Sequence, residues 1–84
     1  MKHFASMRYW RLYETLPERT RLLADKSYAL LRSNPKHPSL QFKRIGSYWT
    51  ARVGLRHRAV GLDLEGDVLW FWIGTHAEYD KLIG

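Results

Sequence analysis

Two pairs of side chains in this sequence have the types and the spacing for acid–base and phosphate chemistry. His76 and Tyr79 lie three positions apart, so they share one face if that stretch is helical. An imidazole beside a phenol can accept and donate protons. Arg52 and Arg58 fall on neighbouring predicted strands, where two guanidinium groups can stabilise negative charge on a phosphate. These four residues are the candidate catalytic residues.

Each candidate also has a purely structural interpretation. Arg58 shares strand parity with Val60, so either that face is partly open or Arg58 lies beyond the edge of the core. Arg52 could be an exposed strand charge that discourages edge pairing. His76 could be a surface residue in the first turn of a helix, and Tyr79 could anchor that helix to the sheet. Both interpretations stay open at this stage.

The positive charge is concentrated in the middle half of the chain. The 84 residues carry a net charge of +6, and no Asp or Glu occurs from residue 26 to residue 62. The basic residues of that segment are Lys26, Arg32, Lys36, Lys43, Arg44, Arg52, Arg56 and Arg58. Such a field attracts phosphate backbones or an acidic protein partner, and a basic surface that serves only solubility is the alternative. We expect Lys43, Arg44 and Arg56 to contact phosphate groups.

Composition argues against metal, disulfide and membrane chemistry. The chain has no Cys and its four His are scattered, so no disulfide, thiolate site or His cluster is expected. The acidic residues Asp63, Glu65 and Asp67 lack calcium-loop spacing. We therefore expect no metal and no cofactor. No stretch is apolar over the length of a signal peptide or a membrane span, which predicts a single cytoplasmic domain over residues 1–84.

A run of six apolar residues, 68–73, organises the rest of the chain. It is rich in aromatic and β-branched side chains and too short for a buried helix, which predicts a strand at the centre of the sheet, covered on both faces. Thr75 and Glu78 follow with capping-box spacing. A short helix is therefore predicted to begin there and to carry the imidazole and the phenol at the exit of the strand.

Helical periodicity precedes the strands. Residues 4–16 predict an amphipathic helix with a buried aromatic stripe at every third position. Pro17 fits the first turn of a second helix that ends near Ser33, and the two helices are expected to form a hairpin. Two prolines exclude regular structure from residues 34–39. The predicted stripe consists of Phe4, Met7, Trp10, Tyr13 and Leu16.

Three further strands are predicted at residues 40–45, 48–53 and 57–64, separated by short turns that contain Gly. Helices followed by closely spaced strands indicate an α+β fold. We predict an N-terminal helical hairpin packed on a four-stranded, mainly antiparallel sheet, with a short C-terminal helix. Residues 1–6 are too short and too mixed in character to be expected as a strand.

Three motifs, taken in order, resemble the RelE/ParE superfamily of bacterial type II toxins, in particular its short RelE-like and HigB-like members. They are His37-Pro38-Ser39-Leu40, then Tyr48-Trp49-x-x-Arg52-Val53 with the following Arg58, and finally Gly74-Thr75-His76-x-Glu78-Tyr79-Asp80. The resemblance covers residues 7–83 and implies a compact, microbial-RNase-like domain that a cognate antitoxin neutralises. RelE-like and HigB-like members cut messenger RNA in the ribosomal decoding site, whereas ParE-like members poison DNA gyrase.

The resemblance implies a ribosome-dependent mRNA endoribonuclease. Cleavage without a metal requires the 2′-hydroxyl to attack the adjacent phosphorus, with a base, cations and an acid assisting. By resemblance, Arg52 and Arg58 match the basic residues of the cleaving members, and His76 and Tyr79 match the HigB-like His and Tyr. A DNA gyrase inhibitor and a non-catalytic basic module that only holds an acidic partner remain as alternatives. Many superfamily members also begin with a strand that joins the sheet.

Overall fold

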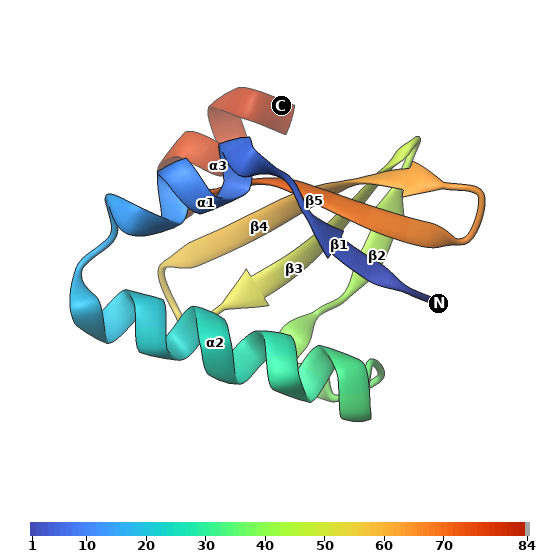
Figure 1. The fold of residues 1–84 in the computed structure, drawn as a ribbon, viewed down its shortest axis with the longest axis horizontal. Coiled ribbons are helices and arrows are strands. Elements are labelled where there is room, and N and C mark those ends of the chain that lie inside the picture. The colour runs from blue at the N-terminus through green and yellow to red at the C-terminus, as the bar shows by residue number, and fades with distance from the viewer. Residues whose placement is uncertain (84) are drawn as a thin grey trace.

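The computed structural model describes residues 1–83 as one mixed sheet with helices on both faces (Figure 1). The sheet has five strands in the order β1-β5-β4-β3-β2. Strand β1 runs parallel to β5, and the other neighbouring strands are antiparallel. The predicted α+β class is confirmed. In chain order, the elements are β1 (His3–Ala5), α1 (Met7–Glu14), α2 (Glu18–Ser33), the 3₁₀ helix η1 (Pro38–Leu40), β2 (Lys43–Ile45), β3 (Tyr48–Val53), β4 (His57–Leu64), β5 (Asp67–Thr75) and α3 (His76–Ile83).

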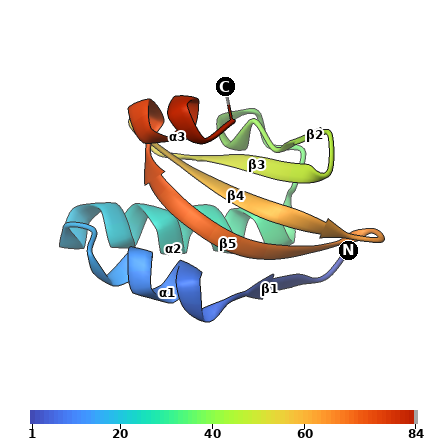
Figure 2. The ribbon, with the colours of Figure 1, turned by 90° about the horizontal axis from the view of Figure 1, so that it is seen from above.

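The sheet separates two unlike layers. Figure 2 shows α3 on one face of the sheet and α1 with α2 on the other. The larger hydrophobic cluster lies on the side of α1 and α2 and includes Leu31 and Trp70. The smaller cluster lies on the side of α3 and contains Val60, Trp72 and Tyr79. We call these two sides the helix-pair face and the α3 face.

A fifth strand at the N-terminus corrects the predicted count of four. Strand β1 pairs with β5, and its ends are fixed by main-chain hydrogen bonds from Ser6 N–H to Trp70 O and from Val68 N–H to Lys2 O, both 2.9 Å. Three residues suffice because the main chain, not a side-chain pattern, makes this pairing. An N-terminal strand therefore joins the sheet, although residues 1–6 were not expected to form one.

The predicted aromatic stripe of the first helix is wrong, because it assigns several exposed side chains to the buried face. Helix α1 begins after Ser6, whose hydroxyl accepts a hydrogen bond from the Tyr9 N–H at 3.2 Å. The helix turns Tyr9 and Leu12 toward the core and leaves Met7 and Trp10 72% and 47% exposed. A spacing of three drifts around a helix of about 3.6 residues per turn, so one face cannot hold the whole stripe.

The two N-terminal helices do not form a tightly packed hairpin. Helix α1 packs mainly on β5, whereas α2 packs mainly on β3. Helix α2 spans the predicted residues almost unchanged, beginning directly after Pro17. The separation of the two helices leaves the cavity described below.

Strand β5 is covered on both faces as predicted, but the strand order places β4, not β5, at the centre of the sheet. Its alternation is broken by a bulge, because Gly61 pairs with Trp70 and Val60 pairs with Trp72, leaving Phe71 as the extra residue. Trp70 consequently packs on the helix-pair face, and Phe71 and Trp72 both join the α3 face.

The remaining strands follow the alternation of the sequence closely. Strands β3 and β4 have the predicted bounds. Strand β2 is shorter than predicted, because Pro38–Leu40 forms a 3₁₀ helix in which His37 Nδ1 accepts from the Ser39 N–H at 3.2 Å. A two-residue turn joins β4 to β5 with positive φ at both Glu65 and Gly66, as tight hairpins require.

Candidate functional site

The two predicted catalytic arginines face each other across neighbouring strands. Arg52 on β3 pairs directly with Arg58 on β4, and both share the parity of Val60 and so lie on the α3 face. Arg52 is half-buried, and its Nε donates to the Gly54 carbonyl at 3.1 Å. Like charges placed directly opposite in a sheet are destabilising. An anion bound between the two guanidinium groups would relieve that repulsion.

Arg58 is buried although its side chain carries a positive charge. It is only 8% exposed, and its guanidinium lies 5.2 Å from the centroid of the Tyr79 ring. Its Nη2 donates to Gln41 Oε1 at 2.8 Å, but its Nε and Nη1 are buried without a hydrogen-bond partner. Buried donors without acceptors cost free energy, and a charged group costs most. Arg58 therefore holds two buried donors for which residues 1–83 supply no acceptor.

Helix α3 brings the predicted imidazole and phenol to the same site. Its N-terminus has the predicted capping box: the Thr75 N–H donates to Glu78 Oε1 at 2.9 Å, and the Glu78 N–H donates to Thr75 Oγ1 at 3.1 Å. These bonds from Thr75 to the carboxylate lower the pKa of Glu78. The rings of His76 and Tyr79 lie 5.9 Å apart, as the i, i+3 spacing predicts.

The environments of His76 and Tyr79 differ. His76 is half-exposed at its side chain, and its Nδ1 lies 3.2 Å from Asp80 Oδ2, a carboxylate that can orient the ring. Tyr79 is buried beneath the helix, where it contacts Arg58. The main chain ties the helix to the β3–β4 turn, because the His76 N–H donates to the Arg56 carbonyl at 2.8 Å.

The three predicted phosphate contacts separate in space. Lys43 pairs with Thr50 on the α3 face and is exposed near the arginine pair. Arg56 is exposed in the turn beside the start of α3. Arg44 lies on the opposite, helix-pair face, where its Nη2 is 3.4 Å from Asp63 Oδ2. The Trp49 indole, donating at 2.8 Å, and Arg44 together lower the pKa of Asp63.

Sequence reasoning missed Gln41, the residue that holds Arg58. Gln41 directly follows η1 in the left-handed conformation, with φ 44°. That backbone turns its side chain toward a strand 17 positions further along the chain. A lone Gln after a loop gives no sign of such a contact, so only the pairing of β2, β3 and β4 reveals it.

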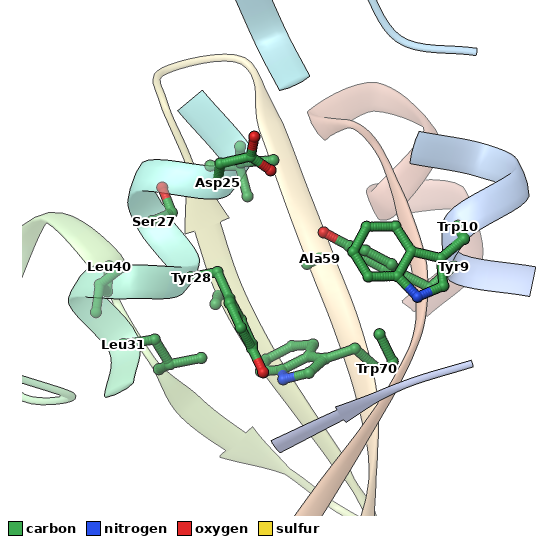
Figure 3. Close-up of a pocket in the computed structure, with 13 residues that line it drawn as sticks. Tyr9, Trp10, Asp25, Ser27, Tyr28, Leu31, Leu40, Ala59 and Trp70 are labelled. Carbon is green, nitrogen blue, oxygen red and sulfur yellow. The ribbon is translucent and has the colours of Figure 1, made fainter. Parts of the chain in front are cut away.

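A second feature lies on the helix-pair face. A cavity of about 220 Å³ separates α1 from α2 above the sheet. Figure 3 shows Tyr9 and Trp10 on one side of it and Tyr28 on the other, with Trp70 and Ala59 toward the sheet. Burial raises the pKa of Tyr9 to about 12. The space exists because the side chains facing it from the sheet and α2 include the small residues Ala24, Ala51 and Ala59.

Residues 1–83 offer neither a metal site nor a membrane-spanning helix. Within this range, no group of three or more His, Asp or Glu side chains is placed to hold a metal ion. None of the helices in the same range combines the length and apolar character needed to cross a membrane.

The chain is similar in structure to several solved toxins over nearly its whole length. It matches a chain of the RelB–RelE antitoxin–toxin complex from Methanococcus jannaschii with a TM-score of 0.71 and 10% identity, covering 96% of this chain and 99% of that one. It matches the YoeB/ParE toxin from Agrobacterium tumefaciens at 0.66 and 18% identity, with 90% and 99% covered. For the isolated RelE toxin from E. coli the values are 0.63 and 13%, with 99% and 98% covered.

These matches identify the class of the fold. It is an α+β fold in which helices cover both faces of a largely antiparallel sheet. The particular fold is that of the solved RelE and YoeB/ParE toxins, as the sequence motifs predict. No protein-family model and no curated protein sequence matches the chain. Function must therefore be argued from the site, since one fold serves several activities.

Proposed function

We propose that this chain is the toxin of a type II toxin–antitoxin system and that it cleaves messenger RNA on the ribosome, and hence acts in the cytoplasm. One observation carries the proposal: Arg58 is buried opposite Arg52 with two donors that no atom of residues 1–83 accepts. The phosphodiester of RNA supplies such acceptors together with one negative charge, in a site partly shielded from water. The RelE/ParE fold supports the same conclusion.

The proposed mechanism uses the groups of the α3 face. Arg52 and Arg58 bind the scissile phosphate and stabilise the charge that develops as the 2′-hydroxyl attacks phosphorus. His76 or Tyr79 removes the proton of the 2′-hydroxyl and protonates the 5′-oxygen that leaves as its bond to phosphorus breaks, and Asp80 orients the imidazole. Because the Tyr79 ring lies against the Arg58 guanidinium, this mechanism requires α3 to move outward to admit the phosphate. Lys43 and Arg56 contact the flanking backbone from exposed positions.

The test is primer-extension mapping of a message in a translating extract. The wild-type chain is compared with Arg58→Ala and His76→Ala, and with Arg44→Ala as the control, because Arg44 is a guanidinium on the other face. We expect cuts at defined codon positions that disappear in the first two variants and persist in the control. An intact message at doses that inhibit the extract would refute cleavage.

The alternatives make different use of the same residues. A gyrase inhibitor, the activity that the sequence resemblance implies for ParE-like members, is the second candidate, and a supercoiling assay would detect it. The burial of Arg58 and Tyr79 together also suits a non-catalytic binding module in which both residues are structural. Such a module would keep its partner affinity when His76 is replaced, whereas an enzyme loses turnover.

The proposed antitoxin has a docking place on the helix-pair face. The cavity between α1 and α2 is bordered by exposed aromatic side chains, including Trp10 and Tyr28, and suits apolar side chains of an amphipathic helix. Acidic residues on that segment would also meet the basic charge of the chain. We expect association in stopped-flow measurements to slow as salt is raised. A rate constant independent of salt would contradict the electrostatic part of this proposal.

A further inference from the structure

An apolar hollow lies beside the arginine pair on the α3 face and has no part in the proposed chemistry. It has a volume of about 370 Å³ and is lined by Ile45, Tyr48, Val60, Phe71, Leu82 and Ile83, with the β2–β3 turn at its edge. Tyr48 is 40% exposed, and its ring centroid is 6.1 Å from that of Phe71 at an interplanar angle of 54°. Two aromatic rings therefore open onto solvent in one concave place.

The sheet itself connects this hollow to the candidate site. Tyr48, Thr50 and Arg52 occupy alternate positions of β3, so they follow one another along the α3 face. Four residues of strand span about 13 Å, a distance that one or two nucleotides of an extended strand can bridge. The bulge in β5 turns Phe71 toward the same face.

The charges around the hollow are positive. The Arg8 guanidinium lies 6.0 Å from the centroid of the Phe71 ring, and the exposed Lys43 stands on the neighbouring strand on the same face. None of the described residues that line the hollow is acidic. A ligand that offers a flat apolar ring joined to a phosphate matches this combination, because bases stack on aromatic side chains while cations hold the backbone.

We infer that the hollow binds one base of the RNA strand, stacked on Tyr48 and flanked by Phe71, and so positions the phosphate next to Arg52 and Arg58. This inference rests on the proposed RNA cleavage and adds to it a positioning role for two residues outside the catalytic group. The base lies one or two nucleotides from the cut. Stacking accepts any base, so the hollow sets the register of the strand more than its sequence.

A cross-strand row supplies a matched control. Phe4, Leu69, Leu62 and Tyr48 are successive partners across β1, β5, β4 and β3, so all four face the α3 side. Phe4 is an aromatic residue with 48% exposure, but it lies three strands from Tyr48, about 14 Å away. A partner protein laid along the whole row would need Phe4, whereas a single base in the hollow would not.

The experiment measures single-turnover cleavage of a synthetic message programmed into ribosomes. Wild type is compared with Tyr48→Leu, Phe71→Leu, Tyr48→Phe and Phe4→Leu, after thermal melting has shown which variants are folded. Each variant also receives messages with one abasic nucleotide at each position flanking the cut. We expect Tyr48→Leu to lower the rate roughly 5- to 100-fold, as the loss of one stacked base does. Tyr48→Phe and Phe4→Leu should stay within about threefold of wild type.

The abasic messages distinguish base stacking from a purely structural role of Tyr48, because a structural role would not change how much an abasic nucleotide slows cleavage. One abasic position should slow the wild-type chain as much as Tyr48→Leu does, and it should slow Tyr48→Leu no further. If Tyr48→Leu does not fold, Phe71→Leu carries the same comparison, and Tyr48→Phe remains the control that keeps the ring. Suppose that the wild-type chain cleaves the message. If an abasic nucleotide then slows all variants equally, or if Phe4→Leu lowers the cleavage rate as much as Tyr48→Leu, the stacking site is refuted but the proposed cleavage is not. A wild type that cuts no message overturns both.

Discussion

The sheet face under α3 contains buried hydrogen-bond donors without acceptors. The sheet face under α1 and α2 contains an apolar cavity instead. Within residues 1–83, the buried side-chain nitrogen and oxygen atoms that lack a partner belong to Thr50 and Arg58, both on the α3 face. On the helix-pair face the polar groups are paired: Trp49 donates to Asp63 and Trp70 donates to His3. That face instead carries the alanine-floored cavity.

The unpaired donors of one face and the cavity of the other indicate two kinds of ligand. Donors without acceptors are relieved by an anion, and unfilled apolar space is relieved by apolar side chains. The proposed RNA and the proposed antitoxin therefore use opposite faces of one sheet. If this is correct, a substitution that removes the unpaired donors or fills the cavity should stabilise the chain and impair the function of that face only.

Arg58→Met tests the α3 face with the largest expected effect. We expect RNA cleavage to fall by about 100-fold or more, because a cation at the reacting phosphate is lost. The free energy of unfolding, measured with urea and tryptophan fluorescence, should be unchanged or about 1 kcal/mol higher, since an unsatisfied buried charge is replaced by an apolar side chain. A strongly destabilised Arg58→Met protein would instead identify Arg58 as a structural residue and favour the binding module.

Ala59→Val tests the other face. The added methyl groups enter the cavity, so the free energy of unfolding should rise by up to about 1 kcal/mol. Affinity for the antitoxin should fall roughly tenfold, because the space for its apolar side chain is partly filled. Cleavage should not change. Ala29→Val, on an exposed position of α2, is the control, and equal antitoxin binding by all three proteins would place the antitoxin elsewhere.

His3 gives a pH-dependent test of the paired polar groups on the helix-pair face. Its Nδ1 accepts from the Trp70 indole at 3.2 Å, so that nitrogen must be unprotonated. Burial, followed by the N-terminal ammonium and Arg32, lowers the pKa of His3 from 6.5, and Asp67 opposes this. The folded state therefore binds the proton less readily than the unfolded state. Stability from neutral His3 is complete above about pH 6.5 and is lost as the pH falls below it.

We expect the urea midpoint and tryptophan emission to change in that interval below pH 6.5, and His3→Phe to remove this component. Strand β1 should show the earliest rise in amide exchange, because only three residues pair it with β5. A midpoint that is flat over the interval in wild type, or that falls equally in His3→Phe, would show that the Trp70 contact contributes nothing to the fold.

Local patterns predicted the parts of the fold that local physics determines. Alternation defined β3 and β4, and the Thr75–Glu78 spacing defined the start of α3. The parts it missed depend on pairing between distant segments. Strand β1 exists only because β5 lies beside it, 65 positions away in sequence. The phase of α1 was wrong because a short aromatic spacing was taken for a buried face.

The candidate site divides in the same way. Arg52, Arg58, His76 and Tyr79 meet because strand parity and helical spacing are local and regular. Gln41 could not be found, since its contact with Arg58 depends on a left-handed residue after η1. Neighbouring basic residues in a short strand look alike in sequence, although alternation sends them to opposite faces. Lys43 and Arg44 are such a pair.

Substitutions of Lys43 and Arg44 have the smallest expected effects, but they compare the two faces most selectively. Lys43→Ala should lower cleavage about 3- to 10-fold and reduce the salt dependence of RNA binding by about one unit of slope, because one phosphate contact on the α3 face is lost. Arg44→Ala should change cleavage by less than about threefold, since Arg44 already pairs with Asp63 on the helix-pair face.

Both variants remove one positive charge from adjacent positions, so net charge cannot explain a difference between them. A difference would reflect the face alone, and it would agree with RNA lying across the α3 face. If Arg44→Ala were as slow as Lys43→Ala, the basic field of the whole chain would be steering RNA without a defined track. Arg52 and Arg58 would then be the only residues of the α3 face for which a specific phosphate contact is still proposed.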